Sequence, residues 1–168
     1  MTRRALTLKW LFYGLWTLLF LLLQQLVLPF LRLWDVHPFL IPPLAAIAAS
    51  FEGRREGLTY ALVLGLVCSL LFDGVFPCSY AVISLLCAIA AGVSAHRLIM
   101  PGPVCSLVVS AIALLLNGIV SGMALSYSYG APFTAALSLT VRELLLSLPF
   151  AMLVHLAFSR VHHRFAKR

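Results

Sequence analysis

Residues 10–31 form an apolar run without a single charged side chain, and this run limits what the chain can become. It contains ten leucines, each of which favours membrane insertion by roughly 0.5 kcal/mol at a helix centre. The run is long enough to cross the hydrocarbon core of a bilayer as a helix. It is too long for the apolar region of a signal peptide, and residues 29–32 offer no small-residue cleavage site. We therefore expect a retained transmembrane helix.

The rest of the chain continues this pattern. Its 168 residues are 62% hydrophobic and only 10% charged, whereas about a quarter of the residues in a soluble domain are charged. The candidate membrane spans are residues 10–31, 38–51, 58–72, 77–95, 104–125 and 141–158. The sequence therefore predicts an all-α, polytopic membrane protein, a single domain over residues 1–168 with a bundle of six transmembrane helices.

The second and third spans are short, so a re-entrant hairpin is an alternative to two crossings. The tip of such a hairpin, residues 52–56, would carry four charged side chains. Burying these at bilayer depth would cost several kcal/mol or more. Two tilted or locally thinned crossings are therefore the favoured interpretation.

The basic residues indicate the orientation of the bundle. With six spans both termini lie on one side of the membrane, and ten of the 12 basic residues fall on that side. Only Arg32 and Arg142 fall on the other side. Because positive charge concentrates in cytoplasmic loops, we expect cytoplasmic termini. The net charge of +7 then reflects topology and contact with anionic lipid. No nucleic-acid partner is expected, because the charges are scattered over short loops.

A ridge of small residues runs along the predicted third helix. Every fourth residue belongs to it: Gly57, Ala61, Gly65, Ser69 and Asp73. Small residues at this spacing allow two helix backbones to approach closely. The ridge can pack against other helices of the same chain, receive a partner protein, or do both.

Charged residues at the predicted outer interface form a second candidate site. Asp73, Arg142 and Glu143 all map there, and near-membrane charges are costly unless they are satisfied. A salt bridge between Asp73 and Arg142 would tie the third helix to the sixth. The alternative is that these residues meet a partner.

Catalytic and metal-binding patterns are weak. Ser121 with His155 is the nearest serine–base pair, but the surrounding Gly-x-x-Ser-Gly differs from the Gly-x-Ser-Gly of intramembrane serine proteases. Ser121 is also expected near the outer side of the membrane and His155 near the cytoplasmic side, so much of the bilayer separates them. The cysteines match no zinc or redox spacing: Cys68, Cys78, Cys87 and Cys105. We predict no enzyme activity, no metal and no cofactor.

The segment Gly65-xxx-Ser69-xxx-Asp73 resembles the Gly-xxx-Gly-xxx-Asp motif of the rod shape-determining protein MreD family. Chain length, cytoplasmic termini and the order of elements agree with that family, and the similarity is concentrated in residues 38–95. Ser69 replaces the usual second glycine, and the Leu-Gly that commonly follows the external turn is absent.

This resemblance implies a non-enzymatic scaffold of the machinery that builds lateral peptidoglycan in rod-shaped bacteria. The protein would be a multi-pass protein of the bacterial cytoplasmic (inner) membrane. It would bind the bitopic membrane protein MreC and, directly or through it, the MreB filament and the cell-wall synthases.

A second interpretation is the substrate-binding subunit of an energy-coupling-factor vitamin transporter, which is also a six-helix protein of this size. Such a subunit needs polar and aromatic residues around an outer pocket. The candidates here are Trp34, Asp35, His37, Tyr127, Tyr129 and Arg142. Those subunits dock a coupling protein through Ala-xxx-Ala on the first helix, and this chain lacks that motif there.

Overall fold

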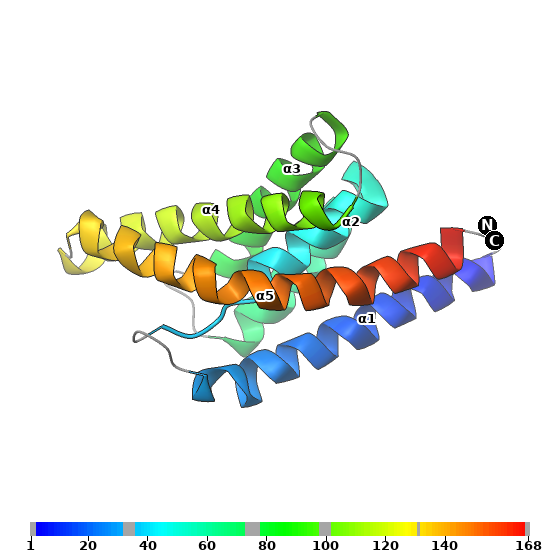
Figure 1. Ribbon diagram of the computed structural model, residues 1–168, viewed down its shortest axis with the longest axis horizontal. Coiled ribbons are helices and arrows are strands. Elements are labelled where there is room, and N and C mark those ends of the chain that lie inside the picture. The colour runs from blue at the N-terminus through cyan, green and yellow to red at the C-terminus, as the bar shows by residue number, and fades with distance from the viewer. Residues whose placement is uncertain (1–2, 32–35, 73–77, 98–101, 131, 167–168) are drawn as a thin grey trace.

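The computed structural model describes residues 3–31, 36–72, 78–97, 102–130 and 132–166. In this part of the chain the regular elements are five α-helices and one short 3-10 helix (Figure 1). Their bounds are Arg3–Leu26 for α1, Leu28–Phe30 for η1, Ile41–Leu71 for α2, Ser79–Arg97 for α3, Pro103–Tyr129 for α4 and Phe133–Ala166 for α5. The protein is therefore all-α, as predicted.

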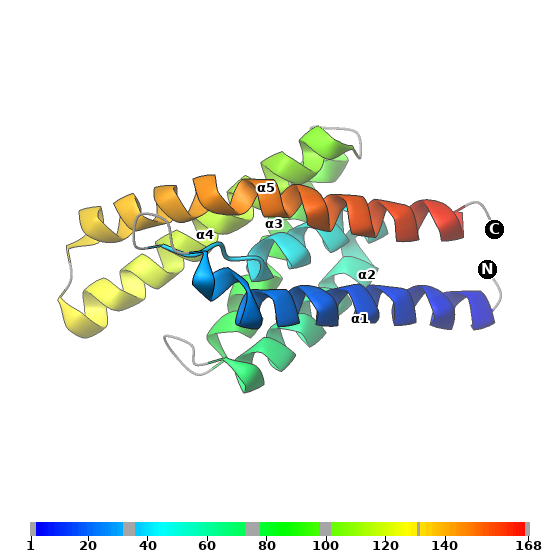
Figure 2. The same ribbon diagram turned by 60° about the horizontal axis from the view of Figure 1, so that its bottom comes forward.

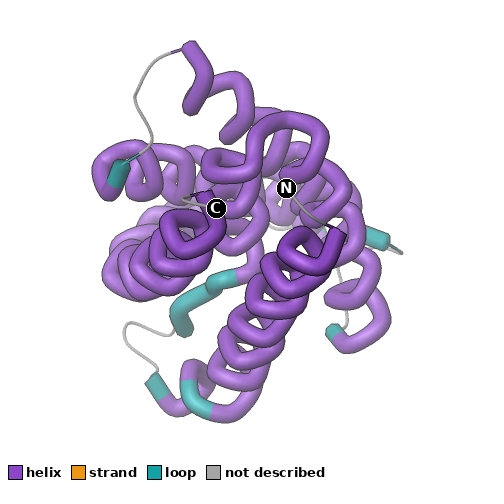
Figure 3. Tube along the Cα trace, turned by 90° about the vertical axis from the view of Figure 1, so that its right-hand side faces the viewer, coloured by secondary structure: helices purple, strands orange, loops and turns teal. Residues whose placement is uncertain are grey.

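Helices α1 and α5 lie side by side and run in opposite directions, so that α1 begins at the same end of the molecule at which α5 ends (Figures 1 and 2). Helix α4 packs along α5. Viewed from the end that carries both termini, nearly all of the described chain is helical, with only short loops (Figure 3). The start of α1 and the end of α5 therefore lie at the same end of the molecule (Figures 1 and 2).

Helix α2 is a hairpin and not a single straight helix. Gly53 interrupts it with φ 80° and ψ 179°, a conformation that is readily accessible only to glycine. A Cβ atom added at Gly57 would lie 2.5 Å from the Cα atom of Ala49. In a straight helix these positions would be roughly 12 Å apart. The chain therefore folds back at Gly53, and residues 41–52 and 54–71 pack against each other.

The first half of α2 forms the centre of the molecule. Every residue from 40 to 50 is buried, as expected for a helix that is hydrophobic on all sides. The surrounding helices are α3, α4, α5 and the second half of α2. Residues 41–52 extend over only roughly 18 Å, which is shorter than a hydrocarbon core of about 30 Å. Other helices enclose this half of α2, and as a span it requires a locally thinned bilayer.

Three helices are long and apolar enough to cross a membrane: Leu6–Phe30, Pro103–Ser128 and Phe133–Phe165. Ser79–Ser94 is a shorter apolar helix. These helices fit a multi-pass membrane protein. Six complete crossings remain a prediction, because both halves of α2 and α3 are shorter than the other spans.

The connection between α4 and α5 is shorter than the predicted gap between the last two spans. Helix α4 continues to Tyr129 and α5 already begins at Phe133. Gly130, with φ 64°, ends α4, and its N–H donates to the carbonyl oxygen of Ser126. Residues 133–140 contain neither glycine nor proline, and they extend α5 ahead of the predicted span 141–158.

The segment that precedes α2, residues 36–40, is not helical and is held in place by α1. We call it the strap. The buried Gln24 amide donates to the carbonyl oxygen of Pro38 at 3.1 Å. Its oxygen accepts a hydrogen bond from the N–H of Leu40 at 2.9 Å. One side chain thus satisfies two backbone groups that helix formation leaves unpaired.

Candidate functional site

The small-residue ridge faces the protein's own helices over its first three members. Gly57 packs within the α2 hairpin, as described above. Ala61 is fully buried, and its carbonyl oxygen accepts a hydrogen bond from Ser84 of α3 at 2.8 Å. A Cβ atom at Gly65 would lie 2.5 Å from the Cα atom of Ala81. This part of the ridge therefore brings α2 and α3 into backbone contact.

The other end of the ridge is less enclosed. Ser69 is half-buried, and its hydroxyl has no hydrogen-bond partner among the described residues. Asp73 lies outside the described residues. Because the protein's own helices cover Gly57, Ala61 and Gly65, a partner contact of the ridge stays a prediction.

We expect Gly65→Ala to lower the free energy of unfolding by about 1–3 kcal/mol, because the new methyl group would overlap the backbone of α3. Gly92→Ala is the matched control, since a Cβ atom there meets nothing within 4 Å. That variant should melt at the wild-type temperature or slightly above it, because alanine favours the helix. Thermal unfolding of the purified proteins in mild detergent measures both. Equal melting temperatures would contradict the close α2–α3 contact.

A buried ionic cluster lies at the tip of the α2 hairpin, which we call the Glu52 cluster: Lys9, Tyr13, Glu52 and His162. Lys9 forms an ion pair with Glu52, and their side chains are only 9% and 3% exposed. The Tyr13 hydroxyl donates to Glu52 Oε1 at 2.7 Å. His162 Nδ1 lies 3.2 Å from the same oxygen. The cluster therefore joins α1, α2 and α5 at the end that carries both termini.

Aromatic rings enclose this cluster. The Tyr13 ring, which has no exposed surface, meets the edge of Phe158 at 4.9 Å between centroids. The Tyr60 ring also packs against Phe158, with 6.2 Å between the ring centroids. The Tyr60 hydroxyl lies 2.6 Å from Thr17 Oγ1. In such a water-poor setting an ion pair is strong when complete and costly when one partner is missing.

The ionisation of Glu52 follows from these contacts. Burial raises the pKa of its carboxyl group, but hydrogen bonds from Lys9, Tyr13 and His162 and the charge of Lys9 outweigh burial. Its pKa is therefore lower than the ordinary value of 4.5. Because the folded pKa lies below the unfolded pKa, the cluster stabilises the fold fully above pH 4.5, and this contribution is lost as the pH falls through the folded pKa.

Sequence reasoning missed this cluster. It treated residues 52–56 as the charged connection between the second and third spans and counted Lys9 only as a topology signal. One signal was present: Lys9 and Tyr13 are four residues apart and lie on one face of an apolar helix. Only the fold shows that Glu52 is their partner.

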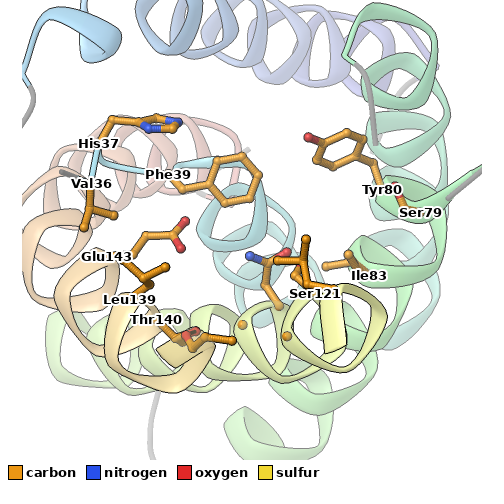
Figure 4. A pocket seen from close by; sticks show the side chains of 15 residues that line it. Val36, His37, Phe39, Ser79, Tyr80, Ile83, Ser121, Leu139, Thr140 and Glu143 are labelled. Carbon is orange, nitrogen blue, oxygen red and sulfur yellow. Dashed lines mark hydrogen bonds between the residues drawn. The ribbon is translucent and has the colours of Figure 1, made fainter. Parts of the chain in front are cut away.

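A polar cavity of about 350 Å³, the outer pocket, lies between the strap, α3, α4 and α5 (Figure 4). Its polar lining includes His37, Ser79, Tyr80, Asn117, Ser121, Thr140 and Glu143. The Glu143 carboxylate and the Tyr80 hydroxyl point into the cavity from opposite sides (Figure 4). No described residue forms an ion pair or hydrogen bond with Glu143.

The other two predicted outer-interface residues, Arg142 and Asp73, are not among the described residues that line the pocket. Arg142 is exposed and does not line the pocket, because it is displaced by about 100° around α5 from Glu143. The structure does not test the predicted salt bridge between Arg142 and Asp73, because Asp73 is not among the described residues. Among the aromatic candidates, Tyr127 is 95% exposed, whereas His37 does line the pocket. Trp34, Asp35 and the side chain of Tyr129 are not described.

The serine–histidine pair considered from the sequence is not formed. His155 Nδ1 lies 2.6 Å from the hydroxyl of Ser106, and both side chains are buried. Ser121 lines the outer pocket, roughly 22 Å further along α4 than Ser106. Sequence reasoning missed the Ser106–His155 hydrogen bond, which ties α4 to α5.

The four cysteines are free, with Cys78 exposed and Cys68, Cys87 and Cys105 buried. Within residues 3–166 as far as they are described, no group of three or more His, Cys, Asp or Glu side chains could hold a metal ion.

An apolar groove of about 450 Å³ separates α1 from the second half of α2, and we call it the α1–α2 groove. The residues that line it are Trp10, Gly14, Thr17, Leu18, Leu21, Thr59, Tyr60, Val63, Leu64 and Val67. At Gly14 a Cβ atom would meet nothing within 4 Å. Helix α1 packs mainly on α5, so the groove stays open between α1 and α2.

A scan against models of protein families, a search of curated proteins and a search of solved structures each found no match to this chain.

Proposed function

We propose that this chain is a non-enzymatic membrane scaffold that holds the transmembrane helix of a bitopic partner in the α1–α2 groove, and that it serves the bacterial cell-elongation machinery. The observation that carries the proposal is the groove itself. It is almost wholly apolar and extends along α1 from Trp10 to Leu21, roughly 17 Å or three helical turns.

The open position at Gly14 would let the backbone of a partner helix approach α1 closely. In lipid, apolar surface alone does not drive association, because lipid tails are as apolar as leucine. Helix association in lipid is driven instead by the close backbone contact that small residues allow. Gly14 is the small residue of α1 in the groove, and no other described part of the chain covers it.

The link to cell elongation rests on the resemblance of Gly65-xxx-Ser69-xxx-Asp73 to the MreD motif. Under this proposal the bundle crosses the bacterial cytoplasmic membrane six times with both termini in the cytoplasm. An MreC-like bitopic protein occupies the groove. The MreB filament and the cell-wall synthases join directly or through that protein.

Affinity purification of the tagged protein from its native host, in mild detergent and with mass spectrometry, tests the proposal. We expect a bitopic membrane protein and cell-wall synthases to copurify with the wild type. Gly14→Trp should abolish this capture by filling the groove, while its melting temperature stays unchanged. Leu15→Trp is the control, because Leu15 is 55% exposed and faces away from the groove.

Loss of the partner in Gly14→Trp alone would support the proposed groove. Equal capture by both variants would show that the groove is not the docking surface. Copurification of paired ATPases in place of wall synthases would overturn the scaffold itself.

A second candidate function is the substrate-binding subunit of a vitamin transporter, and the outer pocket favours it. A cavity of about 350 Å³ falls within the range of small-molecule sites. The bound vitamin would appear in mass spectrometry of the small molecules that copurify.

A further inference from the structure

We propose that the outer pocket binds a small organic cation, with Glu143 as its counter-charge and Asn117 as its hydrogen-bond partner. This inference goes beyond the scaffold function. It rests on the cavity alone and does not depend on the α1–α2 groove.

The charge of the pocket points to a cation. Among the described residues of the lining, Glu143 is the one carboxylate, and none of them is a lysine or arginine. Glu143 lies roughly 15 Å along α5 from its first residue, within the stretch that is apolar enough to span a membrane. A carboxylate at that position is costly unless it is paired, and no residue of the described chain pairs with it. An ammonium group supplies both the charge and N–H donors.

Asn117 adds a second, independent polar group. Its side chain is 7% exposed and lines the cavity. Its amide forms no hydrogen bond with any described residue, so its donor and acceptor groups are available to a ligand in the cavity. A ligand with both donor and acceptor groups satisfies it.

Two aromatic rings make the pocket better suited to an organic cation than to a bare metal ion. Phe39 and Tyr80 line it with ring centroids 6.3 Å apart. Aromatic faces attract ammonium groups and also cover apolar carbon atoms. Figure 4 shows Phe39 between His37 and Tyr80 on the side of the cavity that faces Glu143 and Ser121.

The wall that carries Phe39 is fixed before any ligand binds. The Phe39 N–H donates to Ser147 Oγ of α5 at 2.8 Å, and Gln24 holds the strap on both sides of this residue. A wall that is already ordered saves the ligand the cost of ordering it.

The test uses the whole purified protein in detergent, with 2-phenylethylammonium as the probe and phenylacetate as a probe of similar shape and opposite charge. Saturation-transfer NMR and the shift of the melting temperature report binding. We expect saturable binding of the ammonium probe only. Glu143→Gln should weaken it by at least about tenfold, because a charge-assisted hydrogen bond is lost. Arg142→Gln, one residue away and outside the pocket, should leave it unchanged.

Equal binding of both probes, or no saturable binding of the ammonium probe to the wild type, would overturn the inference. So would full binding by Glu143→Gln. If that variant does not fold, the comparison of the two probes on the wild type still decides. Partner capture by Gly14→Trp and Leu15→Trp is measured separately, so failure of one proposal is distinguishable from failure of the other.

Discussion

Replacing Lys9 with methionine is expected to lower the free energy of unfolding by about 3–5 kcal/mol, the usual result of removing one partner of a buried ion pair. Methionine keeps much of the lysine stem but leaves the carboxylate of Glu52, 3% exposed, without its counter-charge. The measurement is unfolding of the detergent-solubilised protein, followed by tryptophan fluorescence. Arg4→Met is the matched control, because Arg4 is an exposed basic residue of the same helix and should change stability little.

The double variant Lys9→Met with Glu52→Gln separates charge from packing. It should recover much of the lost stability, because no uncompensated buried charge remains. Lowering the pH should destabilise the wild type as Glu52 becomes protonated, below its ordinary pKa of 4.5. The double variant should not share this part of the pH dependence. A Lys9→Met protein as stable as the wild type would show that Glu52 is not a buried anion.

Gln24→Leu is expected to lower the free energy of unfolding by about 2–4 kcal/mol. The change leaves two buried backbone groups of the strap, the carbonyl of Pro38 and the N–H of Leu40, without their partner. Each unsatisfied group costs about 1–3 kcal/mol. Leucine fills a similar volume and suits the helix, so lost hydrogen bonding is the main effect. Thermal unfolding in detergent measures it.

Gln25→Leu provides the control, because it makes the same substitution at the next residue, which is exposed. This variant should melt like the wild type. The Gln24 variant should also bind 2-phenylethylammonium more weakly, since the strap forms one wall of the outer pocket. Equal melting of the two variants would contradict the role of Gln24 in holding the strap.

The long helices were predictable because hydrophobic length is a local property of the chain. The run over residues 10–31 and the apolar segments of α4 and α5 each read as membrane-spanning helices before any tertiary contact is known. Residues 38–51 were also predicted as a span, and the structure buries residues 41–50 at the centre of the molecule. The tight reversal at Gly53 was harder to predict, because a tight turn and a longer loop between two helices have the same local composition.

The sites were harder to predict because their members are far apart in the sequence. Glu52 meets Lys9 across 43 residues and His162 across 110. A cluster of charges such as residues 52–56 reads as a solvated turn until those partners are known. Glu143 was predicted to be an outer-interface residue, but the pocket around it comes from the strap, α3 and α4 as well as α5. The periodicity of the sequence does not show that residues from these four segments lie together.

The central position of residues 41–50 has a consequence for how the protein is made. This half-helix leaves the ribosome before α3, α4 and α5, the helices that will surround it. Until they follow, it is a short apolar segment joined to a charged turn, without the Ser147 and His162 contacts that α5 will provide for Phe39 and Glu52. The core is thus completed only by helices that are synthesised later, and a chain terminated before α5 presents an unfinished interior to the proteases that survey new membrane proteins.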